Sequence, residues 1–229
     1  WNSRVAEAQM LPQGLGNACT LSLDDGASFA AVALDNSQGV TALELPGITR
    51  WVSLYGPDQQ ITTSDNLGAS PTDTAVIPDS SFTAAVTLFS DGPRAYIGGS
   101  NAAHNSPRIW ETEDGTALTL ATLPALTGLD IIRIDGGLLN GEVVVMAWTE
   151  LGELIIRNGD GDWVLAADQP EGIPRNVAGN GAALILNSNE AGGPAFIVYS
   201  VDADGGLVER RRDTTGAEVF TGLAAMEEP

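Results

Sequence analysis

The stretch LSLDDGASF (21–29) places an acidic pair and a glycine between two apolar runs, with an aromatic residue three positions after the glycine. An aspartate in such a turn can accept hydrogen bonds from backbone N–H groups of its own turn. Gly26 can supply the positive φ that a tight connection needs, and we expect Phe29 to pack back under the turn. The stretch therefore predicts a hairpin turn closed by a structural aspartate.

Similar stretches recur along the chain. In each, a β-like run leads to an aspartate that is followed by a glycine within three residues. With Asp24, Asp65, Asp114, Asp160 and Asp204 as markers, the successive gaps are 41, 49, 46 and 44 residues. Each gap has room for four short strands with their turns, and this is the period of a β-propeller blade.

The apolar runs between these markers have the length of strands. Residues 83–128 and residues 129–174 each hold four such runs, rich in Val, Ile, Leu and aromatic residues. The best helical candidate is RVAEAQML (4–11), for which we expect a short turn of helix. Two further expectations concern the ends: the chain begins at the third strand of a blade, near Cys19, and residues 216–223 supply a strand that completes this blade, with or without the N-terminal segment.

The fold prediction is a single all-β domain over residues 1–229, a β-propeller of about five four-stranded blades; a fragment of a longer propeller, or one half of an assembly, is the alternative. Its blade turns lie near residues 24, 65, 114, 160 and 204, and pairing of N- and C-terminal segments in one blade is a way to close it. Such pairing would leave no open sheet edge across the ring.

The repeated units resemble the Asp-box, or BNR, repeat of sialidase-like propellers and of the related photosynthesis-assembly-factor type. The family motif is Ser/Thr-x-Asp-x-Gly-x-x-aromatic, in the turn between the third and fourth strands of a blade. The first copy matches in full with Ser22, Asp24, Gly26 and Phe29, and the other four copies are degenerate. The resemblance implies that these turn aspartates stabilise the fold, and we nominate none of them as catalytic.

The chain is strongly acidic, with a formal net charge of −20 from 30 acidic and 10 basic residues, and all the basic residues are arginine. Such a surface repels phosphate groups and anionic lipids, so we expect neither nucleic-acid binding nor direct membrane insertion. Two interpretations of the charge stay open. It supports solubility, or it provides a docking face for a basic or cationic partner.

The only cysteine predicts a feature of the core, and the first residue predicts the location of the protein. Cys19 excludes an intramolecular disulfide, and its neighbours NACTLSL predict a small buried hydrophobic side chain. The chain begins at Trp1 without an initiator methionine, which suggests processing or truncation, and a removed signal peptide would leave such a start. We therefore expect a secreted or periplasmic protein.

The sequence contains no set of residues that we recognise as catalytic. A glycosidase needs two carboxylates across a pocket, but 30 acidic residues make such candidates uninformative. Sialidase-type propellers use an arginine triad and a Tyr–Glu pair, and none of the scattered arginines and tyrosines here lies in a matching motif: Arg50, Arg94, Arg108, Arg133, Arg157, Tyr55, Tyr96 and Tyr199. His104, the only histidine, is predicted in a solvated loop, so we predict no catalytic residue and leave enzymatic activity open.

Calcium is the one ion for which the sequence suggests a binding site. Two segments place oxygen ligands at alternate positions, as hard-cation loops do, with Asn158, Asp160, Asp162, Asp202 and Asp204 as candidates. Gln169 stands at the twelfth position from Asn158, so this is not an EF-hand. Polar blade turns give the same pattern without a metal. The alternatives are therefore no cofactor or a structural calcium ion.

Two more patterns concern the surface and the core. In ERRRD (209–213), three arginines stand between acids on a predicted fourth strand, either to neutralise their neighbours or to contact an acidic partner or a second copy of the chain. Trp51, Trp110, Trp148 and Trp163 are predicted to pack in the core, and a stacking platform for sugar is the alternative.

Two functional hypotheses follow from these observations. The first is a non-catalytic propeller that binds a protein partner, as a scaffold or accessory subunit of a larger complex in an exported setting. The second is a carbohydrate-binding or glycoside-hydrolysing propeller, with carboxylates lining the central pocket.

Overall fold

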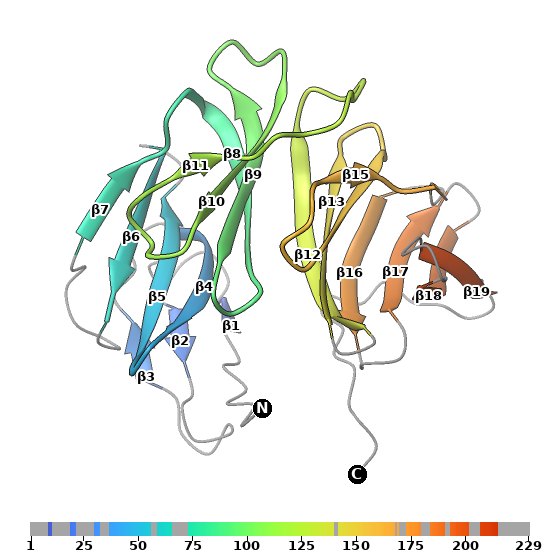
Figure 1. The fold of residues 1–229 in the computed structure, drawn as a ribbon, viewed down its shortest axis with the longest axis horizontal. Helices are drawn as coiled ribbons and strands as arrows, with labels where there is room; N and C mark the ends of the chain where they lie inside the picture. The colour runs from blue at the N-terminus through green and yellow to red at the C-terminus, as the bar shows by residue number, and fades with distance from the viewer. Residues whose placement is uncertain are drawn as a thin grey trace.

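Every regular element of the described chain is a β-strand (Figure 1). The computed structural model describes residues 9–10, 19–21, 30–32, 37–55, 59–65, 73–139, 142–167, 169, 173–179, 184–190, 193–201 and 207–214. Over these residues there is no helix of the length and hydropathy that crossing a membrane would require.

The described strands form five antiparallel sheets, of which the first has three strands and the other four have four strands each. The first sheet holds β1 (Gln9–Met10), β2 (Cys19–Leu21) and β3 (Ala30–Val32), and the second holds β4 (Ser37–Leu45), β5 (Ile48–Tyr55), β6 (Gln60–Ser64) and β7 (Asp73–Val76). The third sheet holds β8 (Ser80–Ser90), β9 (Ala95–Asn101), β10 (Pro107–Thr112) and β11 (Thr119–Leu120), and the fourth holds β12 (Ile131–Leu139), β13 (Glu142–Thr149), β14 (Leu154–Asn158) and β15 (Val164–Leu165). The fifth sheet holds β16 (Ile173–Gly179), β17 (Leu184–Glu190), β18 (Gly193–Val201) and β19 (Leu207–Asp213).

Each sheet is a meander in which every strand pairs with the next one along the chain. The first strands of the four-stranded sheets contact one another in sequence, β4 with β8, β8 with β12 and β12 with β16. Successive sheets therefore turn about a common inner side, as Figure 1 shows for β8 and β12. This is the β-propeller architecture, and the prediction of an all-β propeller of about five blades is confirmed.

The core lies between the blades. Three apolar clusters fill the spaces between the second and third, third and fourth, and fourth and fifth sheets. Along β13, Val144, Met146 and Trp148 belong to the cluster shared with the fifth sheet, whereas Val145 and Ala147 belong to the cluster shared with the third. Because successive side chains of a strand point to opposite faces, a blade that is buried on both faces needs an unbroken apolar run such as VVVMAW (143–148).

The four tryptophans predicted to pack in the core are buried, and each exposes 5% or less of its surface. The prediction of core packing for Trp51, Trp110, Trp148 and Trp163 is confirmed. The alternative of a sugar-stacking platform is wrong for these residues.

The N-terminal predictions need correction. Gln9 and Met10 form β1, paired with Thr20 and Cys19, so the predicted helical turn is wrong at these two residues. Pairing with β2 outweighs the weak helix preference of the local sequence. The first sheet consequently has a strand ahead of Cys19, where the sequence predicted that the chain begins a blade at its third strand. Residues 216–223 lie outside the described residues, and closure by the two termini stays a prediction.

Candidate functional site

The connections of each meander gather at two ends of its sheet. We call one of them the turn end, because it carries the connections between the third and fourth strands. We call the other the hairpin end, because it carries the hairpins between the second and third strands and the linkers to the next sheet. The predicted markers Asp65, Asp114 and Asp160 each follow a third strand and lie at the turn end. The other candidates lie outside the described residues: Ser22, Asp24, Gly26, Phe29, Asp202 and Asp204.

Asp114 closes the turn between β10 and β11. Its Oδ1 accepts the N–H groups of Thr116 and Ala117, both at 2.7 Å, and the hydroxyl of Thr112 at 3.1 Å. The next residue, Gly115, has a φ of +77°. Burial opposes ionisation of Asp114, but the hydrogen bonds outweigh it and lower the pKa of this carboxyl. The carboxylate is thus engaged by the backbone of its own turn.

Arg50, on β5, joins this turn to the preceding sheet. Its Nε and Nη2 donate to the two carboxylate oxygens of Asp65 at 2.6 and 2.8 Å, and its Nη1 donates to the carbonyl oxygen of Asp114 at 2.7 Å. The hydrogen bond from Arg50 lowers the pKa of Asp65. The contact is close, since a Cβ added to Gly115 would lie 2.6 Å from the Cγ2 of Thr63. One guanidinium therefore holds two consecutive blades together.

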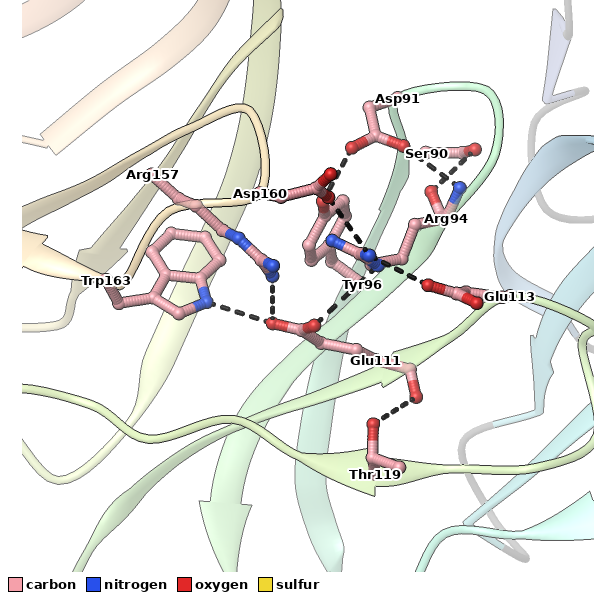
Figure 2. A network of polar contacts seen from close by, with 10 residues as sticks. All are labelled: Ser90, Asp91, Arg94, Tyr96, Glu111, Glu113, Thr119, Arg157, Asp160 and Trp163. Carbon is pink, nitrogen blue, oxygen red and sulfur yellow. Dashed lines mark hydrogen bonds and ion pairs between the residues drawn. The ribbon is translucent and has the colours of Figure 1, made fainter.

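Arg94 occupies the corresponding position one blade later. Arg50 directly precedes Trp51, which pairs with Ser64 at the end of β6. Arg94 directly precedes Ala95, which pairs with Thr112 at the end of β10. The two arginines therefore hold equivalent positions beside the third strands of their sheets. The Nη2 of Arg94 donates to Glu113 at 2.8 Å and to Asp160, in the turn of the fourth sheet, at 3.2 Å (Figure 2). The same device thus links the third blade to the fourth.

Glu111, on β10, is the centre of the polar network in Figure 2. Its Oε1 accepts from the Nη1 of Arg157 at 2.5 Å and from the indole N–H of Trp163 at 3.1 Å. Its Oε2 lies 3.9 Å from the Nε of Arg94. The side chains of Glu111, Arg94 and Arg157 expose only 14, 16 and 10% of their surface. One carboxylate consequently neutralises two largely enclosed guanidinium groups between the blades.

Tyr96 lies beneath this network and is fully buried. Its hydroxyl donates to Asp91 at 2.5 Å, and its ring stacks on Phe89 and meets Trp163 edge-on at centroid distances of 6.4 and 6.0 Å. The guanidinium of Arg157 lies 5.9 Å from the ring centroid. Burial raises the pKa of Tyr96, and the hydrogen bond to Asp91 acts in the same direction. Tyr96 thus joins side chains of the third sheet to Arg157 and Trp163 of the fourth.

The structure therefore brings together only part of the residue set that sialidase-type chemistry would need, namely Arg94, Arg157 and Tyr96. The remaining arginines pair elsewhere: Arg108 with Asp79 at 3.6 Å and Arg133 with Asp135 at 2.7 Å. Tyr199 is buried in the cluster between the fourth and fifth sheets, and the side chain of Tyr55 lies outside the described residues.

Of the calcium candidates, Asn158 ends β14, and Asp160 and Asp162 lie in the connection between β14 and β15. Asp160 is 91% exposed and directs one carboxylate oxygen to Arg94. In the part of the chain that the structure describes, no group of three or more His, Cys, Asp or Glu side chains is arranged to hold a metal ion. A structural calcium ion stays a prediction.

At the hairpin end, two glutamates fix the linker that leads from β11 to β12. The carboxylate of Glu153 accepts the N–H groups of Thr127 and Gly128 at 3.0 and 2.8 Å. The carboxylate of Glu150 accepts the N–H groups of Leu129 and Asp130 at 2.7 and 2.8 Å. We call this pair the glutamate clamp. Burial opposes ionisation of both carboxyls, but the backbone hydrogen bonds outweigh it and lower both pKa values.

Two leucines project from the segments that the clamp joins. Leu129, in the linker, is 41% exposed, and Leu151, in the β13–β14 hairpin, is 65% exposed. The linker is also held by the hydroxyl of Ser100, which donates to the carbonyl oxygen of Leu129 at 2.7 Å. We call Leu129 and Leu151 the leucine ledge. It combines apolar side chains in solvent with a backbone that several hydrogen bonds hold in place.

His104 lies in the hairpin between β9 and β10, at the same end. Its side chain is 51% exposed, which confirms the predicted loop position, and its Nε2 lies 3.2 Å from Asp130. The imidazole thus lies beside the linker and adds a polar contact at the rim of the leucine ledge.

Sequence reasoning missed three engaged carboxylates, those of Glu111, Glu150 and Glu153. Glu111 gives no local signal, because Arg157 and Trp163 lie 46 and 52 residues further along the chain. Glu150 and Glu153 have a weak signal, two acids in the hairpin sequence TELGE (149–153), which does not say what they bind.

Comparisons with known proteins address the fold. No protein-family profile and no curated protein matches the sequence. Among solved structures, BBS1N in complex with ARL6DN, soaked with lead, aligns with a TM-score of 0.60 at 13% identity, over 93% of this chain and 69% of that one. U3-55K aligns with a TM-score of 0.61 at 10% identity, over 90% and 63% of the two chains. Sqt1 of Saccharomyces cerevisiae aligns with a TM-score of 0.54 at 12% identity, over 85% and 55%.

The chain is a β-propeller. At these identities the likeness shows the fold alone. The Asp-box resemblance is a finer statement, and it continues to rest on the motif of residues 22–29.

Proposed function

We propose that this propeller is a non-catalytic module that binds a protein partner at its hairpin end, as a scaffold or accessory subunit of a larger complex. The observation that carries the proposal is the leucine ledge, with two exposed leucines on segments fixed by Glu150 and Glu153. A surface that is already ordered loses little conformational entropy when a partner binds, and this favours affinity.

The charge around the ledge indicates the chemistry of the partner. Both clamp carboxyls have lowered pKa values, so they are ionised at neutral pH. The chain as a whole has a net charge of −20. A partner segment that carries apolar side chains for the leucines and lysines or arginines around them would be complementary, and the charge would accelerate the encounter.

The structural neighbours support a protein partner. BBS1N was crystallised in complex with ARL6DN, so a propeller with a similar fold takes a protein ligand. The carbohydrate alternative draws no support from Glu111, Glu150 or Asp114, because internal arginines or backbone amides engage each of these carboxylates.

The experiment is a quantitative affinity purification of the tagged protein from its native source. It compares the wild type, the double variant Leu129→Asn/Leu151→Asn and the control Ile48→Asn, whose isoleucine is 39% exposed at the turn end. We expect partners that the wild type and the control retain and the ledge variant loses. Equal retention by all three would contradict the proposal.

A glycan array and a glycoside-hydrolysis screen on the wild type test the carbohydrate alternative, since saccharide binding or turnover would replace the scaffold interpretation. The exported setting also stays part of the proposal. Fractionation of the native cells checks it, and recovery of the protein with the cytoplasmic fraction would contradict it.

A further inference from the structure

The outer edge of the fifth sheet differs from the outer edges of the sheets before it. β19 is the last strand of its sheet and has 7 residues, whereas the corresponding strands β7, β11 and β15 have 4, 2 and 2. One side of β19 pairs with β18, and no other described strand pairs with its second side. Long edge strands present a row of backbone N–H and C=O groups that can pair with another chain.

The charge of this strand also differs from that of the chain. Residues 209–213 (ERRRD) have three of the 10 arginines and two acids, a net charge of +1 in a chain of net charge −20. The strand is therefore a local positive stretch on an acidic protein.

Two of the three arginines of β19, Arg210 and Arg211, are held less tightly than those between the blades, whereas Arg212 donates to both carboxylate oxygens of Glu209 at 3.0 and 2.7 Å. The side chain of Arg211 is 73% exposed, and its Nη2 lies 3.6 Å from Asp213. The Nε of Arg210 donates to the hydroxyl of Ser200 at 2.5 Å, which leaves its charge without a neutralising carboxylate at that contact. By comparison, Arg157 lies 2.5 Å from Glu111 and its side chain is only 10% exposed.

We propose that the outer edge of β19 accepts an extended acidic segment of another protein by β-strand addition. Main-chain hydrogen bonds would supply affinity along the strand, and a carboxylate on the matching face of the incoming strand would meet the exposed Arg211. Charged side chains on an edge strand also block unwanted pairing. An arginine-rich edge discourages neutral and basic strands and leaves acidic ones as its complement.

A second copy of this chain fits the same edge poorly. In a two-fold antiparallel pairing centred on Arg211, Arg210 would stand opposite Arg212 and Glu209 opposite Asp213. Moving the centre by half a residue in either direction places Arg211 opposite Arg210 or Arg212, while Glu209 then stands opposite Arg212 or Arg210 opposite Asp213. Like and unlike charge pairs therefore offset one another in self-pairing, whereas an acidic strand can place only unlike charges opposite the arginines, so the favoured occupant is a different, acidic chain.

This surface is separate from the leucine ledge, and the two proposals fail independently. The probe for β19 is a fluorescent peptide of alternating Glu and Val flanked by Thr. A glutamine version removes its charge, and a version with a central proline removes strand pairing. The protein variants are Arg211→Gln and the matched control Arg108→Gln, which loses the same charge from β10, and urea unfolding verifies that both are folded.

We expect the wild type to bind the acidic peptide, more weakly as salt is added, and to protect the amides of residues 207–213 from hydrogen exchange. Binding should fall about fivefold or more in Arg211→Gln and stay unchanged in Arg108→Gln, with the glutamine and proline peptides much weaker. Equal weakening by both variants, full binding of the proline peptide, no binding of the acidic peptide, or a dimer lost with Arg211→Gln would each overturn the proposal.

Discussion

The turn end and the hairpin end of this propeller use the same residue type for different tasks. At the turn end, Glu111 and Asp65 pair with arginines, and the resulting contacts hold successive blades together. At the hairpin end, Glu150 and Glu153 accept backbone N–H groups and fix a linker in place. The first arrangement stabilises the ring of blades, whereas the second stabilises the surface from which Leu129 and Leu151 project. Acidic side chains therefore both join neighbouring blades and hold in place the linker from which the leucine ledge projects.

Replacement of Glu111 with alanine tests the turn end and should have the largest effect. Arg94 and Arg157 would lose their shared carboxylate while their side chains stay largely enclosed. We expect a loss of about 3 kcal/mol in the free energy of unfolding, measured with urea. The control is Glu113→Ala, which removes a 71% exposed partner of Arg94 and should cost less than about 1 kcal/mol. Equal losses would mean that the network does not hold the blades together.

Replacement of Asp114 with alanine tests whether a turn carboxylate stabilises its own backbone. The variant leaves the N–H groups of Thr116 and Ala117 without their acceptor. We expect a loss of about 1–2 kcal/mol in unfolding free energy, comparable to the loss of a helix cap. Asp162→Ala, in the exposed part of the next blade's turn, should stay within about 0.5 kcal/mol of the wild type. A neutral Asp114→Ala would remove the structural role from this aspartate.

Acidification tests the hairpin end. The pKa values of Glu150 and Glu153 are lowered in the folded protein from their ordinary value of 4.5, so the clamp contributes its full stability above that pH. As the pH falls through the lowered pKa values, both carboxyls take up protons and this contribution is lost. The variant Glu150→Gln/Glu153→Gln lacks these two titrations.

Between about pH 5 and pH 3, unfolding free energy should therefore fall more steeply for the wild type than for this double glutamine variant. The difference should be below about 1 kcal/mol, because both carboxylates are partly open to solvent. Urea titrations at several pH values measure it. Parallel pH profiles would show that the clamp is not ionised differently in the folded and unfolded states.

Replacement of Leu151 with asparagine should have the smallest effect on stability. Its side chain is 65% exposed, so the unfolding free energy should change by no more than about 0.5 kcal/mol. Retention of the native partner should nevertheless fall, whereas Ile48→Asn should leave it unchanged. A large loss of stability would mean that Leu151 is part of the core, and its loss of partner could then not be assigned to the ledge.

The architecture could be predicted from the sequence because its signals are local and repeated. The four runs in residues 83–128 became β8–β11, and the four in residues 129–174 became β12–β15. Apolar runs such as VVVMAW report burial on both faces, and the aspartate spacing reports the blade period. The N-terminal segment misled the prediction because RVAEAQML has a weak helical pattern, and the pairing of Met10 with Cys19 is a tertiary contact.

The polar site could be predicted only in part because its contacts join distant parts of the chain. Arg94 meets Asp160 across 66 residues, and Thr127 meets Glu153 across 26, so no sequence window contains both partners. The tyrosine and arginines considered for catalysis do approach one another, and they are paired with Asp91 and Glu111 in a largely buried network. The burial of these side chains depends on how two blades pack against each other, which no local sequence pattern shows.

The hairpin end is the surface that we propose binds the partner. The most direct measurement is hydrogen–deuterium exchange on the complex recovered from the native source, compared with the free protein. We expect new protection in residues 121–130 and 149–154, with residues 45–48 and 113–117 at the turn end unchanged. Protection confined to the turn end, or none in the linker and hairpin that carry Leu129 and Leu151, would contradict it.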